Sequence, residues 1–303
     1  YVGGYSHLTA WERARSRGES IGRFVLVRLK ALAVPALALL GVWVALGITL
    51  GIIFNLKWIG RAVLLVVSPL WFMGVYLALV ALLPVFLWLH RRWDTIVLVW
   101  FAAIAGAVDI LRFRYHYDWL GLVNMLAVWG LCHQLGFFFD DLVAAPRHVD
   151  WALMLGGLFG LLALIFSGVY PASMVGVNTD KISNMGPPTF TIVMLVLFQA
   201  GVAEVMRPRM ERRLEGGGWA KVNDTINRFS MPLFLFHTTG MALSRAARYA
   251  WAGQKNEATE PTAWWWLSRP IAFIGPLVFT LPVIFLFGRR WVKPRRSSAA
   301  PAA

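Results

Sequence analysis

Long apolar runs constrain this chain more than any other feature. Eight of them are dense in Leu, Val, Ala, Ile and Phe, and a helix of roughly 20 such residues is long enough to cross the apolar core of a bilayer. They cover residues 34–54, 67–88, 95–111, 119–139, 151–170, 190–206, 231–248 and 270–287. None shows the alternation of polar and apolar residues that is typical of a barrel strand. The sequence therefore predicts an all-α fold, a polytopic transmembrane helix bundle with about eight spans in this chain.

Composition and charge agree with a membrane protein. The 303-residue chain is 58% hydrophobic and only 15% charged, which is too apolar for a protein whose whole surface faces water. A net charge of +14 would favour nucleic-acid binding in a soluble protein, but about two thirds of the 29 Lys and Arg residues fall in loops on one side of the predicted spans. The positive-inside rule makes that side cytoplasmic. We therefore expect a multi-pass protein of the cell membrane that contacts the lipid bilayer and no nucleic acid.

One predicted span contains an unexpected polar pair. The segment "WGLCHQLGFFFDD" carries His133 and Gln134 near its middle and ends on two aspartates, of which the first is Asp140. At helical spacing His133, Phe137 and Asp140 share one face, and ionisable residues inside a membrane usually face the bundle interior or a water-filled cavity. We predict that His133 is catalytic and lines a polar cavity open to the cytoplasm, with Asp140 near its mouth. The alternative is that His133 only joins helices by hydrogen bonds and that Asp140 is a solvated charge at the end of the span.

A second histidine is expected at the same depth in the membrane. His133 and His237 each lie about seven residues from the cytoplasmic end of their predicted spans, or roughly 10 Å below the surface. His237 is therefore a further catalytic candidate. A packing role beside Thr238 and Thr239 is the alternative.

Arginines in the predicted cytoplasmic loops are candidates for binding the phosphates of a substrate, because the guanidinium group binds phosphate through two parallel hydrogen bonds. They are Arg13, Arg15, Arg207, Arg209 and Arg212. The positive-inside rule alone would place the same residues there. No metal site is expected, since the chain has a single cysteine, Cys132, and neither an HExxH nor a CxxC motif.

Polar residues also occur near the ends of other spans. Asp109 and Arg112, and likewise Glu204 and Arg207, are three residues apart and are expected to form local ion pairs in which the arginine extends to the membrane surface. In "DKISNMGPPT" on the predicted outer side, Asn184 precedes two prolines, a pattern typical of a rigid polar turn that starts the next helix. A part in binding an acceptor is the alternative for this turn.

Six segments, taken in order, resemble the acyltransferase-3 family of membrane acyltransferases. They are "VGGYSHLTAWERARSRG", "RFVLVRLKALAVPALALLGVWV", "SPLWFMGVYLALVALLPVFLWLHRRWD", "WGLCHQLGFFFDD", "SNMGPPTF" and "MPLFLFHTTG". The resemblance implies one membrane-embedded domain over residues 1–303, with about ten helices in the full-length protein. The small, polar residues 294–303 are expected to form a disordered cytoplasmic tail.

The resemblance also implies an activity. A member of this family would move an acyl group from a cytoplasmic donor, with acyl-CoA as co-substrate and no bound cofactor, to a hydroxyl of an envelope glycan or lipid. The Arg and His that the family carries about ten residues apart on its first helix are not found here, so we expect that this helix, with its catalytic His, is missing from the chain. A lipid or sugar transporter or flippase, and a non-catalytic relative, are the alternatives. A transporter would be expected to show matched inverted halves, which this sequence lacks.

Overall fold

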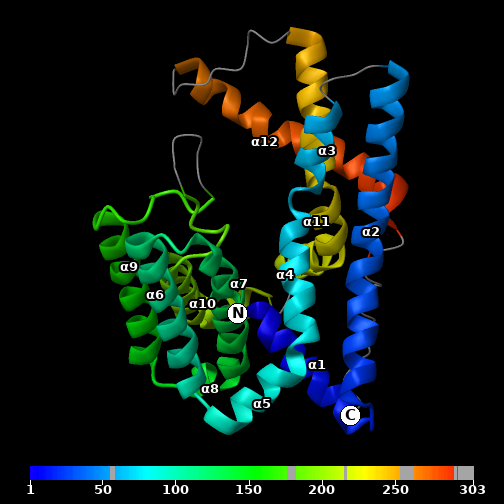
Figure 1. Cartoon of the computed structure of the whole chain (residues 1–303). Helices are drawn as coiled ribbons and strands as arrows, with labels where there is room; N and C mark the ends of the chain where they lie inside the picture. Colours follow the sequence, from blue (N-terminus) through cyan, green and yellow to red (C-terminus); the bar gives the residue numbers. More distant parts are fainter. Residues whose placement is uncertain (55–58, 176–181, 215–216, 253–262, 290–291, 293–303) are drawn as a thin grey trace. The chain divides into compact units, whose positions relative to one another are not determined.

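The computed structural model describes residues 1–54, 59–175, 182–214, 217–252, 263–289 and 292 (Figure 1). Within these residues the secondary structure is helical, apart from an isolated bridge between Met185 and Pro188. The predicted all-α fold is therefore confirmed. The tail expected at 294–303 lies outside the described residues. By its contacts the chain divides into two compact units, Tyr1–Lys30 with Val75–Arg212, and Ala31–Gly74 with Arg213–Ala303, and each is described by itself.

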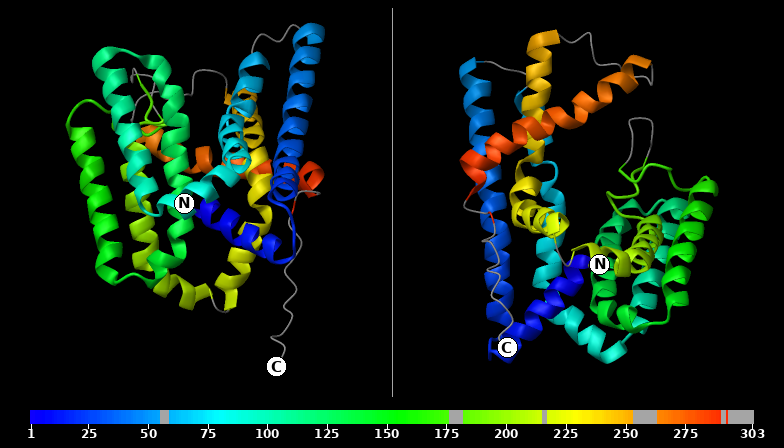
Figure 2. Two further views of the ribbon diagram at one scale, coloured as in Figure 1. Left: turned by 60° about the horizontal axis from the view of Figure 1, so that its bottom comes forward. Right: turned by 180° about the vertical axis from the view of Figure 1, so that it is seen from behind.

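Unit 1 contains most of the buried polar residues in the described part of the chain. Its helices are α1 (Val2–Ser16), the first turns of α2 (Ile21–Phe54), the end of α4 (Leu70–Ala81), α5 (Leu83–Trp93), α6 (Ile96–Tyr115), η1 (Asp118–Leu120), α7 (Gly121–Leu135), η2 (Gly136–Phe138), α8 (Phe139–Ala144), α9 (Arg147–Phe166) and α10 (Phe190–Leu214). Helices α6, α7, α9 and α10 lie side by side as a bundle in every view of Figures 1 and 2. Buried side chains such as Ala105, Val128 and Val193 form an apolar core shared by α6, α7 and α10.

Unit 2 is built around α11 (Gly217–Ala252), which packs against α12 (Ala263–Val283) and α3 (Ile59–Val67). Most of α2 and a short π-helix, η4 (Ile284–Gly288), complete it. Hydrogen bonds join these helices: Thr238 donates to the Val66 carbonyl at 3.0 Å, and the Trp43 indole N–H donates to the Thr239 hydroxyl at 3.2 Å. The polar side chains of α11 are thus used between helices, as hydroxyl groups commonly are inside membranes.

Seven helical segments of the described chain are long and apolar enough to cross a membrane, by length and composition. They are Ile21–Ile53, Ile59–Ala81, Ile96–Tyr115, Asp118–Ala144, Arg147–Phe166, Phe190–Leu214 and Arg269–Gly288. They correspond to seven of the eight predicted spans. The eighth, 231–248, lies within α11 but is not among them, because it includes polar residues such as His237, Ser244 and Arg245. The protein is a multi-pass membrane protein with most of the expected spans.

The predicted span at 67–88 has the wrong boundaries. The helical segment begins at Ile59 and ends at Ala81, and α5 follows as a separate short helix. Pro84 explains this division, because it lies in the first turn of α5, where its missing N–H leaves no hydrogen bond unmade. α5 buries Leu83, Phe86 and Leu87, which places Phe86 beside the polar residues described next.

Candidate functional site

The site begins with one face of α1. Gly4, His7, Trp11 and Ala14 are buried, and their spacings of three, four and three residues place them along a single stripe of the helix. This stripe packs against α7 and η2. α1 is not among the candidate membrane spans, yet its histidine is almost completely enclosed, with 1% of its surface exposed.

Glycines bring the two backbones together. A Cβ atom on Gly4 would overlap the carbonyl oxygen of His133, and one on Gly136 would overlap the carbonyl of Tyr1. Because neither residue has a side chain, α1 lies directly against the end of α7. His7, one turn beyond Gly4, is thereby held beside His133.

The two histidines and a tyrosine form a chain of hydrogen-bonding contacts. Nδ1 of His7 lies 2.9 Å from Nε2 of His133, and Nε2 of His7 lies 3.1 Å from the hydroxyl oxygen of Tyr76. A neutral imidazole carries one donor and one acceptor nitrogen, so this chain has two self-consistent arrangements of its protons. In one of them His133 donates through Nε2–H to His7, His7 donates through Nε2–H to Tyr76, and His133 Nδ1 is left as an acceptor.

Within the described chain, His133 Nδ1 is the end of this series of hydrogen bonds that has no partner. The His133 ring is 3% exposed and lies against the rings of Phe86 and Phe137, with centroid distances of 5.2 and 5.1 Å. Its Nδ1 atom has no hydrogen-bond partner among the described residues, and the same holds for both amide atoms of the fully buried Gln134. Buried polar atoms are costly without a partner. His133 Nδ1 is therefore a buried nitrogen that can still form a hydrogen bond with a substrate group.

The environment keeps His7 neutral at physiological pH. Burial, with a smaller contribution from the positive charge of Arg28, lowers the pKa of His7 from its ordinary value of 6.5 to about 4. A neutral His7 can accept the hydrogen bond from His133. A protonated His7 would have N–H groups on both nitrogens and could not.

The other predicted catalytic residues, Asp140 and His237, do not take part in the hydrogen bonds of His133 and His7. α7 ends at Leu135 and is followed by the 3-10 turn η2, so the helical spacing from His133 to Asp140 is interrupted, and Asp140 lies exposed in the first turn of α8. Phe137, which was predicted on the same helix face as His133, lies against the His133 ring. His237 lies in unit 2, where its Nδ1 is 2.8 Å from the Phe234 carbonyl oxygen of its own helix.

Two of the five predicted arginines line a cavity. This cavity, of about 500 Å³, lies between α9 and α10, and its walls are Arg147, Asp150, Trp151, Val205, Pro208, Arg209 and Arg212. Arg207 instead pairs with Glu204 at 2.8 Å, as its spacing predicted. Arg13 and Arg15 are exposed on α1 and do not line the cavity.

His7 and Tyr76 are the site residues that sequence reasoning missed. His7 had no role of its own in the sequence-based prediction and belonged only to the first segment that resembles the family. The spacing of Gly4, His7 and Trp11 was the available signal, because it indicates a helix face that is buried against another helix. No comparable signal marks Tyr76, an aromatic residue in an apolar run.

Comparison with known proteins agrees with this membrane architecture. The sequence model of one family, described as an acyltransferase domain, matches residues 1–289. No curated protein and no solved structure matches the chain. The match covers nearly all of the helices described above, in both units. The chain therefore belongs to the acyltransferase-3 family of membrane acyltransferases.

Proposed function

We propose that the protein transfers an acyl group from acyl-CoA, bound on the cytoplasmic side, to a hydroxyl of an envelope glycan or lipid, and that, among the histidines of this chain, His133 is the one that acts as general base. Membership of the family supports acyl transfer in general terms. The observation that carries the assignment to His133 is the open Nδ1 atom, buried beside an equally unpaired Gln134. A buried nitrogen without a partner is expected where a substrate hydroxyl completes the hydrogen bonding.

The proposed reaction needs one proton acceptor and one proton donor. His133 Nδ1 takes the proton of the acceptor hydroxyl as its oxygen attacks the thioester carbonyl. The new C–O bond forms, the C–S bond breaks, and the thiolate of CoA receives the proton back from His133. His7 stabilises the intermediate imidazolium by accepting the Nε2–H of His133. His7 is thus a positioning residue, which selects the tautomer in which Nδ1 is free.

The arginine-lined cavity is the proposed site of the CoA phosphates. Arg147, Arg209 and Arg212 supply positive charge, and the Trp151 ring offers a flat surface for a nucleobase. α10, which forms one wall, also contacts the start of α1, because the Tyr1 hydroxyl donates to Glu204 at 2.7 Å. α10 therefore connects a wall of the cavity to the start of α1, the helix that carries His7.

Label transfer in membranes tests the proposal. Membranes that contain the full-length protein are incubated with radiolabelled acyl-CoA, and label is measured in glycan and lipid fractions. We expect His133→Ala to reduce transfer by about 10²- to 10⁴-fold. The exposed His148 provides a matched control, and His148→Ala should leave transfer unchanged. Transfer by His133→Ala at the rate of the wild type would exclude the general-base role, and uptake or flipping of a labelled lipid without any transfer would favour a transporter.

A further inference from the structure

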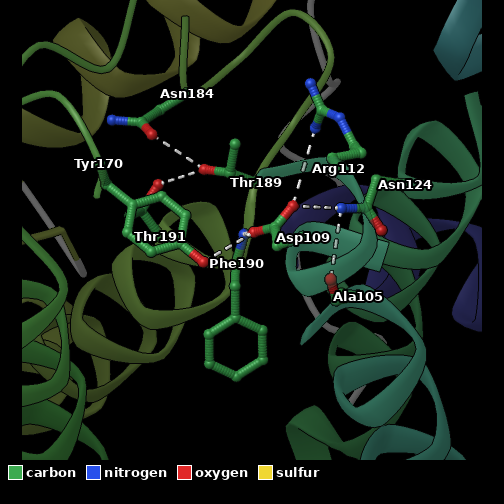
Figure 3. Close-up of polar contacts among 9 residues, drawn as sticks. All are labelled: Ala105, Asp109, Arg112, Asn124, Tyr170, Asn184, Thr189, Phe190 and Thr191. Carbon is green, nitrogen blue, oxygen red and sulfur yellow. Dashed lines mark hydrogen bonds and ion pairs between the residues drawn. The ribbon is translucent and has the colours of Figure 1, made fainter. Parts of the chain in front are cut away.

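A second buried polar cluster lies at the other end of α7, where α6 ends and α7 and α10 begin (Figure 3). Its centre is Asp109 on α6. Oδ1 of Asp109 accepts a hydrogen bond from Asn124 at 2.8 Å, and Oδ2 accepts hydrogen bonds from the Tyr170 hydroxyl at 3.1 Å and from the Phe190 N–H at 2.7 Å. Burial and the Asp109 charge raise the pKa of Tyr170, so its hydroxyl stays protonated and continues to donate. Asp109 is thus fully hydrogen-bonded by neutral groups.

Arg112 is buried in this cluster without a hydrogen bond from two of its nitrogens. Its side chain is 6% exposed, and Nη1 lies 3.7 Å from Asp109 Oδ1, a distance for an ion pair rather than a hydrogen bond. Neither Nε nor Nη1 has a hydrogen-bond partner among the described residues, and Oδ1 of Asn124 also has none. The predicted ion pair is confirmed, and the Arg112 side chain is enclosed by protein. The side chain stays inside, at the edge of the cluster in Figure 3.

Close packing holds the Arg112 guanidinium in its buried position but, in the residues that the structure describes, supplies no hydrogen-bond acceptor for Nε and Nη1. Gly121, the first residue of α7, allows this position, since a Cβ atom there would lie 3.2 Å from Arg112 Cζ and closer still to Pro187. Because Asp109 is satisfied by three other donors, it does not need the N–H groups of Arg112. A buried guanidinium with free donors is strongly unfavourable unless an oxygen completes it.

The position of the cluster indicates which oxygen is available. Arg112 is three residues from the end of α6, a candidate membrane span, and so lies close to the level of the lipid headgroups. Asn124 and His133 are nine residues apart on α7, roughly 13 Å along its axis, so the cluster is separate from the histidine pair. The abundant anionic oxygens at this level are those of phosphate groups.

We propose that Arg112 and Asn124 form a binding site for a phosphate group, with Arg112 donating from Nε and Nη1 and Asn124 Oδ1 accepting from a hydroxyl of the same ligand. The phosphate of a lipid headgroup and free phosphate share this chemistry. The site is independent of the proposed acyl transfer, since it needs neither His133 nor acyl-CoA.

Calorimetric titration of the purified full-length protein in detergent tests the site. The titrants are short-chain dihexanoyl phosphatidylglycerol, inorganic phosphate, and dihexanoylglycerol as the phosphate-free control. We expect saturable binding of the phospholipid, and Arg112→Gln should weaken it about 10- to 100-fold. Arg114→Gln, which changes an exposed arginine two residues away, should bind as the wild type does. Binding of inorganic phosphate as well would show that the phosphate group suffices, whereas binding of the phospholipid alone would identify the headgroup as its source.

Three results would overturn the proposal: no saturable binding to the wild type, equal binding by Arg112→Gln, or equal binding of dihexanoylglycerol. If Arg112→Gln does not fold, Arg112→Lys keeps the charge but not the planar set of donors. It should bind the phospholipid measurably more weakly than the wild type. Equal affinity would contradict the site.

Discussion

Nδ1 of His7 lies 2.9 Å from Nε2 of His133, although the two residues are 126 positions apart in the chain. The contact joins α1 to α7 inside unit 1 and excludes solvent from both rings. It gives each histidine a defined partner and leaves Nδ1 of His133 without one. The proposed base and the residue that orients it are therefore supplied by two different helices.

Removal of His7 should slow the chemical step without weakening substrate binding. In His7→Ala, His133 loses the acceptor that fixes its tautomer, so kcat for acyl transfer should fall more than about tenfold while KM for acyl-CoA stays the same. Steady-state kinetics in membranes measure both constants. A rise in KM with unchanged kcat would show that His7 acts in binding instead.

Enlarging Gly4 should separate α1 from α7. In Gly4→Ala the new methyl group overlaps the His133 carbonyl, so we expect a loss of about 1–3 kcal/mol in the free energy of unfolding and reduced transfer. Gly22→Ala is the control, because nothing lies within 4 Å of a Cβ atom there. Denaturant unfolding in detergent compares the two. Equal stability of the two variants would contradict the close approach of these helices.

Acid should inactivate the enzyme through His7. Its pKa is about 4, so kcat should be constant from pH 7 down to about pH 5 and fall below that as His7 gains a proton and can no longer accept from His133.

The low pKa of His7 should also make stability depend on pH. The unfolded chain keeps a histidine pKa near 6.5, so between pH 6.5 and about pH 4 it binds more protons than the folded chain, and the free energy of unfolding should decrease as pH falls. Unfolding measured at pH 7 and at pH 5 tests the stability effect. In His7→Ala the free energy of unfolding should change less between pH 7 and pH 5 than in the wild type. An equal change in both proteins would assign the effect to another group.

Neutralising the cavity arginines should weaken donor binding. Arg209→Gln combined with Arg212→Gln should raise KM for acyl-CoA by about 10-fold or more, with little change in kcat, because charge-assisted hydrogen bonds to phosphate are lost. Arg91→Gln is the matched control, since Arg91 lines a separate cavity of about 360 Å³ beside Trp11. An increase in KM for Arg91→Gln alone would place the donor in that second cavity.

The sequence predicted the features that depend on local pattern. Apolar length located seven spans, and a spacing of three residues located the ion pairs of Asp109 with Arg112 and of Glu204 with Arg207. Helical spacing also placed Phe137 beside His133. These relations hold within one helix or its immediate continuation, where the backbone geometry is known in advance.

The contacts that could not be predicted from the sequence are those that depend on which helices pack against each other. His7 contacts His133 because two glycines let α1 approach α7. No local sequence pattern indicates that α7 is the helix against which α1 packs. Asp140 was expected on the face of His133, but α7 ends at Leu135, and Asp140 is exposed in the first turn of α8 while His133 is buried. Arg112 was expected in an ion pair near the end of its span, but its enclosure by protein depends on Gly121 of the adjacent helix.

A double-mutant cycle on the two histidines tests the central claim most directly. Single-turnover rates of acyl transfer are measured for the wild type, His7→Ala, His133→Ala and the double variant. If His7 acts only through His133, the double variant should be no slower than His133→Ala alone, so the two effects should not add. Additive losses would show that the histidines act independently and would contradict the proposed role of the pair.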